Sequence, residues 1–163
     1  MPVAPAVQQQ FAFNAGFFDA ALANTPDDAW FKTSADGVQP IVWQVGHVAF
    51  SLFGCAKYLG SDAPMPDGLE AKYGMGSTPS TDPAYNLSPA ELRGHIKTGI
   101  DAVNAAAPTV ADDALAAEYP DPDTRKIFPT IGYLTDFLMT GHLMYHAGQI
   151  GSARKALGMP PLI

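Results

Sequence analysis

The sequence GHLMYHAGQIGSARKALGMPP, residues 141–161, ends a long helical pattern that contains two histidines. The pattern begins after Pro129 and stops at Gly158 and two prolines, so we expect one helix over residues 130–157. With about 100° of rotation per residue, His142 and His146 share one face of this helix. The same face carries mostly apolar and small side chains: Ile131, Thr135, Leu138, Gln149 and Ala153. The two histidines are therefore expected inside the protein.

Three further segments show helical periodicity, and no stretch shows the alternation of a β-strand. They cover residues 5–24, residues 41–59 and a segment that begins at a Ser88 cap and ends before Pro108. The third segment has a strong start signal, because Ser88 is followed by a proline and, three residues after the cap, by Glu91. The sequence therefore predicts an all-α fold.

A long connection, from Gly60 to Leu87, separates the second helix from the third. It is rich in Gly, Pro, Ser and Asp, and a short helical turn is expected near Leu69–Lys72. Loops of this length without structure are uncommon in compact domains and are usually functional or partly ordered. The connection is long enough to let the second and third helices run parallel. We predict one domain over residues 1–163, a four-helix bundle with a long crossover between helices 2 and 3.

The composition argues against several kinds of partner. The chain of 163 residues has a net charge of −7 and nine Lys and Arg residues, which disfavours nucleic acid and polybasic membrane contacts. No window holds about 18 uninterrupted apolar residues, so no membrane span is expected. Cys55 is the only cysteine, which excludes an internal disulfide. Residues 1–10 lack the features of a signal peptide, so we expect a soluble cytoplasmic domain.

The spacing of His142 and His146 alone leaves two interpretations open. An i, i+4 pair is the spacing of helical zinc ligands, but two buried histidines satisfied by hydrogen bonds explain it about equally well. A third histidine, His47, favours the metal. It lies in the middle of a largely apolar face of the second helix, with Trp43, Phe50, Ser51, Gly54 and Tyr58. Three imidazoles with an open coordination position are the pattern of catalytic zinc sites.

Two other residues are weaker candidates for metal binding. His95 lies at the flank of the apolar face of the third helix, so we interpret it as a boundary residue. Cys55 is about two turns from His47 and off its face, so we interpret it as a small buried residue. No carboxylate lies on either histidine face. We therefore expect the groups that orient the imidazoles to come from the 25–40 or 60–87 loops.

An apolar pocket is expected beside the histidines, lined by Trp43, Phe50 and Tyr58. Gln149, one turn beyond His146, is expected in this pocket or in contact with the ligands. A divalent ion held there would lower the pKa of a bound water or thiol and act as a catalytic centre. The alternative is a non-catalytic metal-binding bundle that serves as a sensor or binding module. The three histidines are predicted only as metal ligands, and no catalytic side chain is identified.

Two segments resemble the DinB-like (DinB/YfiT) superfamily. One is DDAWFKTSADGVQPIVWQVGHVAFSLF, residues 27–53, in which an irregular loop leads into the helix that carries His47. The other, residues 142–161, has an HxxxH spacing, then Gly-Gln-Ile at 148–150 and Leu-Gly-Met-Pro at 157–160. The helix count, the long crossover and the chain length also agree, so the resemblance covers essentially the whole chain.

The resemblance implies a four-helix bundle in which His47, His142 and His146 bind a divalent metal ion, commonly nickel or zinc, with waters completing the coordination. It also implies a homodimer, which the apolar character of the helix over residues 41–59 favours as well. Some branches of the family resemble thiol-dependent transferases or isomerases. The expected partners are therefore a small-molecule thiol or another small substrate. Thiol transfer, hydrolysis and the non-catalytic alternative stay open, because the chain has no dedicated thiol-binding motif.

Overall fold

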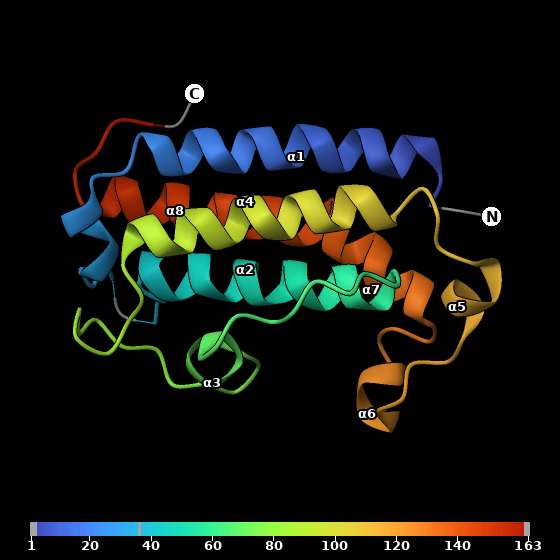
Figure 1. Ribbon diagram of the computed structural model, residues 1–163. Helices are drawn as coiled ribbons and strands as arrows, with labels where there is room; N and C mark the ends of the chain where they lie inside the picture. The colour runs from blue at the N-terminus through green and yellow to red at the C-terminus, as the bar shows by residue number, and fades with distance from the viewer. Residues whose placement is uncertain (1–2, 36, 162–163) are drawn as a thin grey trace.

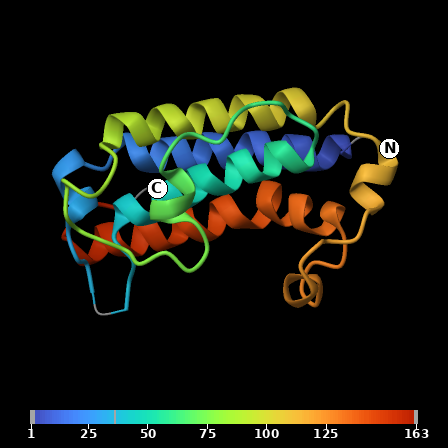
Figure 2. The ribbon, with the colours of Figure 1, turned by 60° about the horizontal axis from the view of Figure 1, so that its bottom comes forward.

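The computed structural model describes residues 3–35 and 37–161, and these residues form helices without a named strand. Within them, the long helical segments lie side by side (Figures 1 and 2): α1 (Pro5–Ala23), α2 (Ile41–Tyr58), α4 (Pro89–Ala106) and a run of α7 (Ile131–Phe137), η2 (Leu138–His142) and α8 (Leu143–Ala156). The all-α prediction is confirmed. The two ends of the domain expected over residues 1–163 lie outside the described residues.

Short helices occupy the connections: η1 (Asp27–Phe31), α3 (Leu69–Tyr73), α5 (Asp112–Ala116) and α6 (Pro122–Arg125). The α3 helix agrees with the turn expected near Leu69–Lys72. The sequence patterns predict none of the other three. Across residues 3–35 and 37–161, no helix combines the length and the apolar character needed to span a bilayer.

α2 and α4 run in the same direction in Figure 1, although α4 is the next long helix after α2. The segment between them, residues 59–88, carries the chain back along α2 and includes α3 (Figure 2). At its end the Ser88 side chain accepts a hydrogen bond from the Glu91 N–H, and the Glu91 carboxylate accepts one from the Ser88 N–H. This capping box starts α4 where the sequence predicts.

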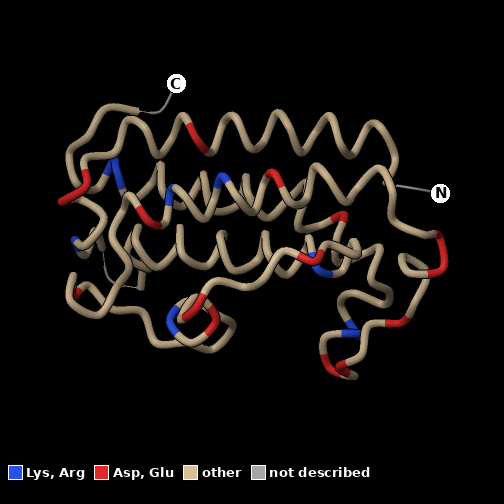
Figure 3. Tube along the Cα trace, viewed as in Figure 1, with Lys and Arg blue, Asp and Glu red and all other residues tan. Residues whose placement is uncertain are grey.

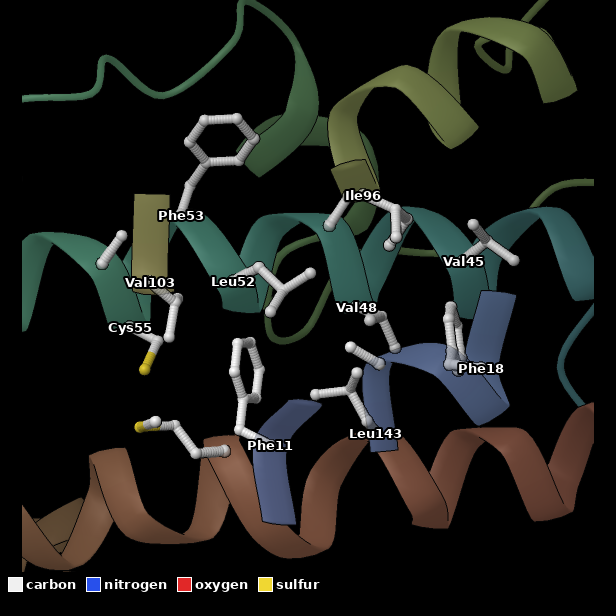
Figure 4. Close-up of a cluster of buried hydrophobic side chains, with 14 of the residues drawn as sticks. Phe11, Phe18, Val45, Val48, Leu52, Phe53, Cys55, Ile96, Val103 and Leu143 are labelled. Atoms are coloured by element: carbon white, nitrogen blue, oxygen red, sulfur yellow. The ribbon is translucent and has the colours of Figure 1, made fainter. Parts of the chain in front are cut away.

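The apolar core lies between the long helices. Figure 4 shows Phe11 of α1, Leu52 of α2 and Leu143 of α8 directed toward one another. α2 packs against α4, α3 and α8. Gly99 of α4 permits a close approach, because a Cβ atom there would lie 2.8 Å from the Leu52 Cβ. Contacts within one chain therefore account for the apolar character of α2 without a second copy.

Charged residues lie mainly outside α1 and α2, as Figure 3 shows. Asp19 is the only charged residue of α1, and Lys57 is the only one of α2. The Lys and Arg residues are spread over several elements in the same view. The two helices that carry few charges are thus held mainly by apolar contacts.

The last helical run contains a π-helical turn, η2, which ends at His142. Such turns insert an extra residue into a helix and are frequent at functional sites. The buried Asn14 side chain of α1 donates hydrogen bonds to the carbonyls of Met139 (3.3 Å) and Thr140 (2.6 Å). These bonds satisfy main-chain groups of the turn and tie it to α1. The uniform helix predicted over residues 130–157 is therefore interrupted.

The buried face of this run is the predicted one, although two of its positions are less buried than the others. Leu138 and Gln149, expected on the core face, are half-buried, whereas Met139 and Ile150 are fully buried. Leu138 lies within η2, where the rotation per residue is not that of an α-helix. Gln149 lines a pocket instead of packing in the core. Leu138 nevertheless packs against the core, and Gln149 lies in a pocket, as the sequence predicts for each.

Replacing Asn14 with leucine is expected to lower the free energy of unfolding by about 1–3 kcal/mol, because buried carbonyls lose their donor. Leucine has a similar size, so the loss reports hydrogen bonds rather than volume. Urea unfolding measures the change. Gln9→Leu, at an exposed position of the same helix, is the control and should stay within about 0.5 kcal/mol. An equally small change for Asn14→Leu would contradict this role.

Candidate metal centre

The three histidines expected to bind a metal, His47, His142 and His146, come together between α2 and the η2–α8 run. One nitrogen from each ring lies within 4.8 Å of the others, so the group could hold a metal ion. The ring centroids are 5.2 Å apart for His47 and His142, 5.3 Å for His47 and His146, and 4.6 Å for His142 and His146. The side chains are 7%, 7% and 5% exposed. We call these three residues the histidine cluster.

The imidazole of His47 is oriented by the short helix α3. Its Nδ1 lies 2.8 Å from the carbonyl oxygen of Tyr73. Because a carbonyl only accepts, Nδ1 carries the proton and donates, which leaves the lone pair on Nε2 of His47. The 60–87 loop thus supplies an orienting group, as expected. Sequence reasoning could not name Tyr73, because a main-chain carbonyl is not tied to any residue type.

Gly46 allows Tyr73 to pack closely against α2. A Cβ atom at Gly46 would lie within 2.6 Å of three ring atoms of Tyr73. The Tyr73 ring is fully buried, and its hydroxyl oxygen accepts a hydrogen bond of 2.8 Å from the Leu87 N–H. The ring therefore has little room to move. Gly46 sets how closely α3 approaches the neighbouring His47.

Replacing Gly46 with alanine is expected to lower zinc affinity about 10- to 100-fold, the usual cost of disturbing a group that orients a metal ligand. The added methyl group must displace Tyr73, and with it the carbonyl that holds His47. Gly54→Ala is a matched control, because Gly54 lies on the same helix and a Cβ atom there meets nothing within 4 Å. Competition with a chromophoric chelator measures both affinities. Equal affinities for the two variants would refute the role of Gly46.

Burial lowers the pKa of all three histidines of the cluster. Desolvation is the largest cause, and it brings the pKa of His142 to about 3 and that of His146 to about 4, with the neighbouring histidines adding to the effect. The pKa of His47 is also lowered by burial, against the opposing hydrogen bond to Tyr73. The rings are therefore neutral at pH 7, which is the form of histidine that binds metal ions.

The chemistry of the cluster fits a transition-metal ion. Nδ1 of His146 is buried and has no hydrogen-bond partner among residues 3–35 and 37–161. An unpaired buried polar atom costs about 1–3 kcal/mol, so a ligand at this atom would stabilise the site. Imidazole nitrogens suit zinc or nickel, whereas magnesium and calcium prefer oxygen ligands.

Comparison with known proteins places the chain in a family. The family model of the DinB superfamily matches residues 10–150. The chain belongs to the DinB superfamily. The matched range includes all three histidines and the first segment, residues 27–53, so the family resemblance is confirmed; the second segment is matched as far as residue 150. No curated protein and no solved structure matches this DinB chain.

The two weaker metal candidates of this DinB protein lie outside the cluster. His95 of α4 contacts the Phe53 ring edge-on, with centroids 6.4 Å apart, and does not belong to the metal-competent group found among the described residues. Cys55 is buried in the core, where burial raises the pKa of its thiol to about 12. The thiol stays protonated and packs as an apolar group. His95 is half-buried at the boundary and Cys55 is a small buried residue, as the sequence predicts.

Two pockets open beside the histidine cluster of this DinB protein. The first, of about 1060 Å³, is lined by Trp43, and the second, of about 520 Å³, is lined by Phe50 and Tyr58. His47 and His142 line both, so the cluster lies where the pockets meet. The sequence predicts one pocket with all three aromatic residues. That prediction is wrong, because the cluster stands between Trp43 and the other two.

Aromatic contacts also restrain His47 from the side of the first pocket. The Trp43 indole stacks on the imidazole with planes 5° apart and centroids 4.9 Å apart. The indole N–H donates a 3.0 Å hydrogen bond to the Ser77 hydroxyl. Gln149 lines the same pocket, as expected. The stack and the Tyr73 hydrogen bond together hold the His47 ring in one orientation.

Proposed function

We propose that His47, His142 and His146 bind one divalent metal ion, nickel or zinc, in this DinB protein. The observation that supports this most is the approach of three buried imidazoles, with one nitrogen of each within 4.8 Å of the others. Their lowered pKa values keep the rings unprotonated at neutral pH. The unpaired Nδ1 of His146 gives a further reason to expect a ligand.

We further propose that the site is catalytic, as a metal-dependent thiol transferase or hydrolase. A bound divalent ion lowers the pKa of a water or thiol in contact with it, which makes a nucleophile available near neutral pH. The chain's own groups hold and shield the site. Tyr73 and Trp43 fix His47, and the edge-on ring of Phe137, 5.6 Å from His142 between centroids, covers the cluster.

A non-catalytic sensor or binding module is the second candidate. Among the described residues, no Asp or Glu belongs to the metal-competent group or lines either pocket, so no carboxylate base is identified there, which favours this candidate. Metal-loaded protein screened with glutathione, mycothiol and bacillithiol against electrophilic acceptors separates the two. Turnover that His146→Ala abolishes supports the enzyme. Stabilisation by metal without turnover supports the binding module.

Two structural proposals accompany this function. The four long helical segments would form the four-helix bundle of the family, with residues 59–88 as its crossover between α2 and α4. The protein would also form a homodimer. Size-exclusion chromatography with light scattering tests the dimer, since twice the chain mass of 17.2 kDa supports it and a single chain mass refutes it.

Metal analysis of protein prepared without chelator or a histidine tag tests the metal site. We expect about one divalent ion per chain, in keeping with one set of three ligands. The double variant His47→Ala/His142→Ala should retain almost none. Stoichiometric metal in that variant would show that the ion binds elsewhere.

A further inference from the structure

The second pocket runs along α2, and the metal site as proposed assigns it no ligand. The α2 residues that line it follow the i, i+3, i+4, i+7, i+11 pattern of one helix face: His47, Phe50, Ser51, Gly54 and Tyr58. The facing wall comes from residues 119–128 and from the α7–η2 run, and includes Phe128 and Phe137. The pocket is therefore a lined cavity between α2 and elements distant in sequence.

The chemical character of the pocket changes along its length. Imidazoles of the histidine cluster stand at one end, and the hydroxyls of Tyr58 and Tyr119, 3.1 Å apart, stand at the other. Tyr58 lies eleven positions after His47 on α2, which corresponds to about 16 Å along the helix. Phe50 lies between the two ends on the same helix, and the ring of Phe128 also lines the pocket.

The tyrosine pair leaves a hydrogen-bond donor for a ligand. The hydrogen bond between Tyr58 and Tyr119 uses one of the two hydroxyl protons. The other proton can bind an acceptor such as a carbonyl oxygen. A polar end of this kind fixes the orientation of a ligand whose body is held by apolar contacts.

We propose that the second pocket binds an aromatic substrate, with a hydrogen-bond acceptor at the Tyr58–Tyr119 pair and its reactive end at the histidine cluster. An aromatic body suits the walls, because rings prefer offset or edge-on contacts with other rings. The volume of about 520 Å³ is typical of small-molecule sites, which range over about 300–1,000 Å³. Binding of the aromatic body and of its acceptor does not depend on the proposed metal site. Only the reaction at the histidine cluster rests on that proposed function.

The first pocket remains available for the second reactant. Both pockets are lined by His47 and His142, so ligands in the two pockets would meet at the cluster. The first is larger and is lined in part by polar side chains, among them Gln149 and Ser152. It therefore suits a water or a small thiol, whereas the aromatic second pocket suits the molecule that this nucleophile attacks.

Binding of 4-propylacetophenone to metal-free protein tests the pocket without the metal. This ketone has an aromatic ring and a carbonyl acceptor but no metal-binding group. We expect it to shift the backbone amide NMR signals of residues 50–54 and 119–128. Gly54→Leu should weaken binding at least tenfold, because a side chain there enters open space and leans toward Phe50. The double variant Tyr58→Phe/Tyr119→Phe should weaken it several-fold.

Gly94→Leu is the control, because Gly94 lies on α4 and a Cβ atom there also meets nothing within 4 Å. It should leave ketone binding unchanged. Signal shifts elsewhere, or binding that Gly54→Leu does not weaken, would overturn the pocket assignment. That outcome leaves the metal proposal intact, since the ketone does not need the ion. Conversely, failure of metal binding with normal ketone binding would overturn the proposed function alone.

Hydroxamates test whether the pocket leads to the histidine cluster. Acetohydroxamate carries a metal-binding head alone, and 4-phenylbutanohydroxamate carries the same head with an aromatic tail. We expect the tail to increase affinity for the zinc-loaded protein at least tenfold by calorimetry. Gly54→Leu should remove this gain and leave acetohydroxamate binding unchanged. A gain that persists in Gly54→Leu would contradict the connection between pocket and cluster.

Discussion

Replacing His142 with alanine is expected to lower the affinity for zinc or nickel a few hundredfold. Structural zinc sites with four ligands bind with about 10–16 kcal/mol, so one ligand contributes about 2.5–4 kcal/mol. His142 is buried at the junction of the two pockets, where alanine leaves no nitrogen in its place. Competition with a chromophoric chelator, at a pH near 7.5 where the remaining rings are neutral, measures the loss.

His95→Ala is the matched control for this prediction. It removes an imidazole from α4 that contacts Phe53 and lies outside the histidine cluster. Its zinc affinity should equal that of the unchanged protein. If His95→Ala weakens binding as much as His142→Ala does, the cluster is not the binding site.

Metal-free protein is expected to lose about 4 kcal/mol of stability between about pH 7.5 and about pH 5 through His142 and His146. In the unfolded chain a histidine has a pKa of about 6.5 and takes up a proton as the pH falls through that value. In the folded protein burial keeps the pKa of His142 at about 3 and that of His146 at about 4. Acid therefore favours the unfolded state, and each residue costs about 2 kcal/mol by pH 5.

Urea unfolding over this pH range measures the effect. The window lies above the ordinary carboxyl pKa values of about 4, so histidines dominate it. The double variant His142→Gln/His146→Gln cannot titrate at these positions and should lose most of the slope. An equal slope in the variant, or no slope in the unchanged protein, would contradict the neutral buried state of the cluster.

Local sequence signals predict the long helices well. Ser88 and Glu91 form the capping box that the spacing predicts, and Pro40 precedes α2 as expected. These signals act within a few residues and depend little on the rest of the chain. The histidines could be found in the same way, because each is a polar residue in the middle of an apolar helix face.

Features that depend on distant contacts could not be predicted. The π-helical turn before α8 is tied to α1 by Asn14, more than a hundred residues away in the sequence. The group that orients His47 is a main-chain carbonyl, which leaves no residue signature. The division into two pockets depends on where residues 119–128 lie relative to α2, which helical periodicity does not determine.

Anomalous diffraction from crystals grown with zinc or nickel tests the metal site most directly. We predict one strong peak between His47, His142 and His146, at about 2.0–2.1 Å from one nitrogen of each ring. The His47 contact should come from Nε2, with Nδ1 still donating to the Tyr73 carbonyl. No peak at the cluster, in crystals that show the metal bound elsewhere on the chain, would contradict the account.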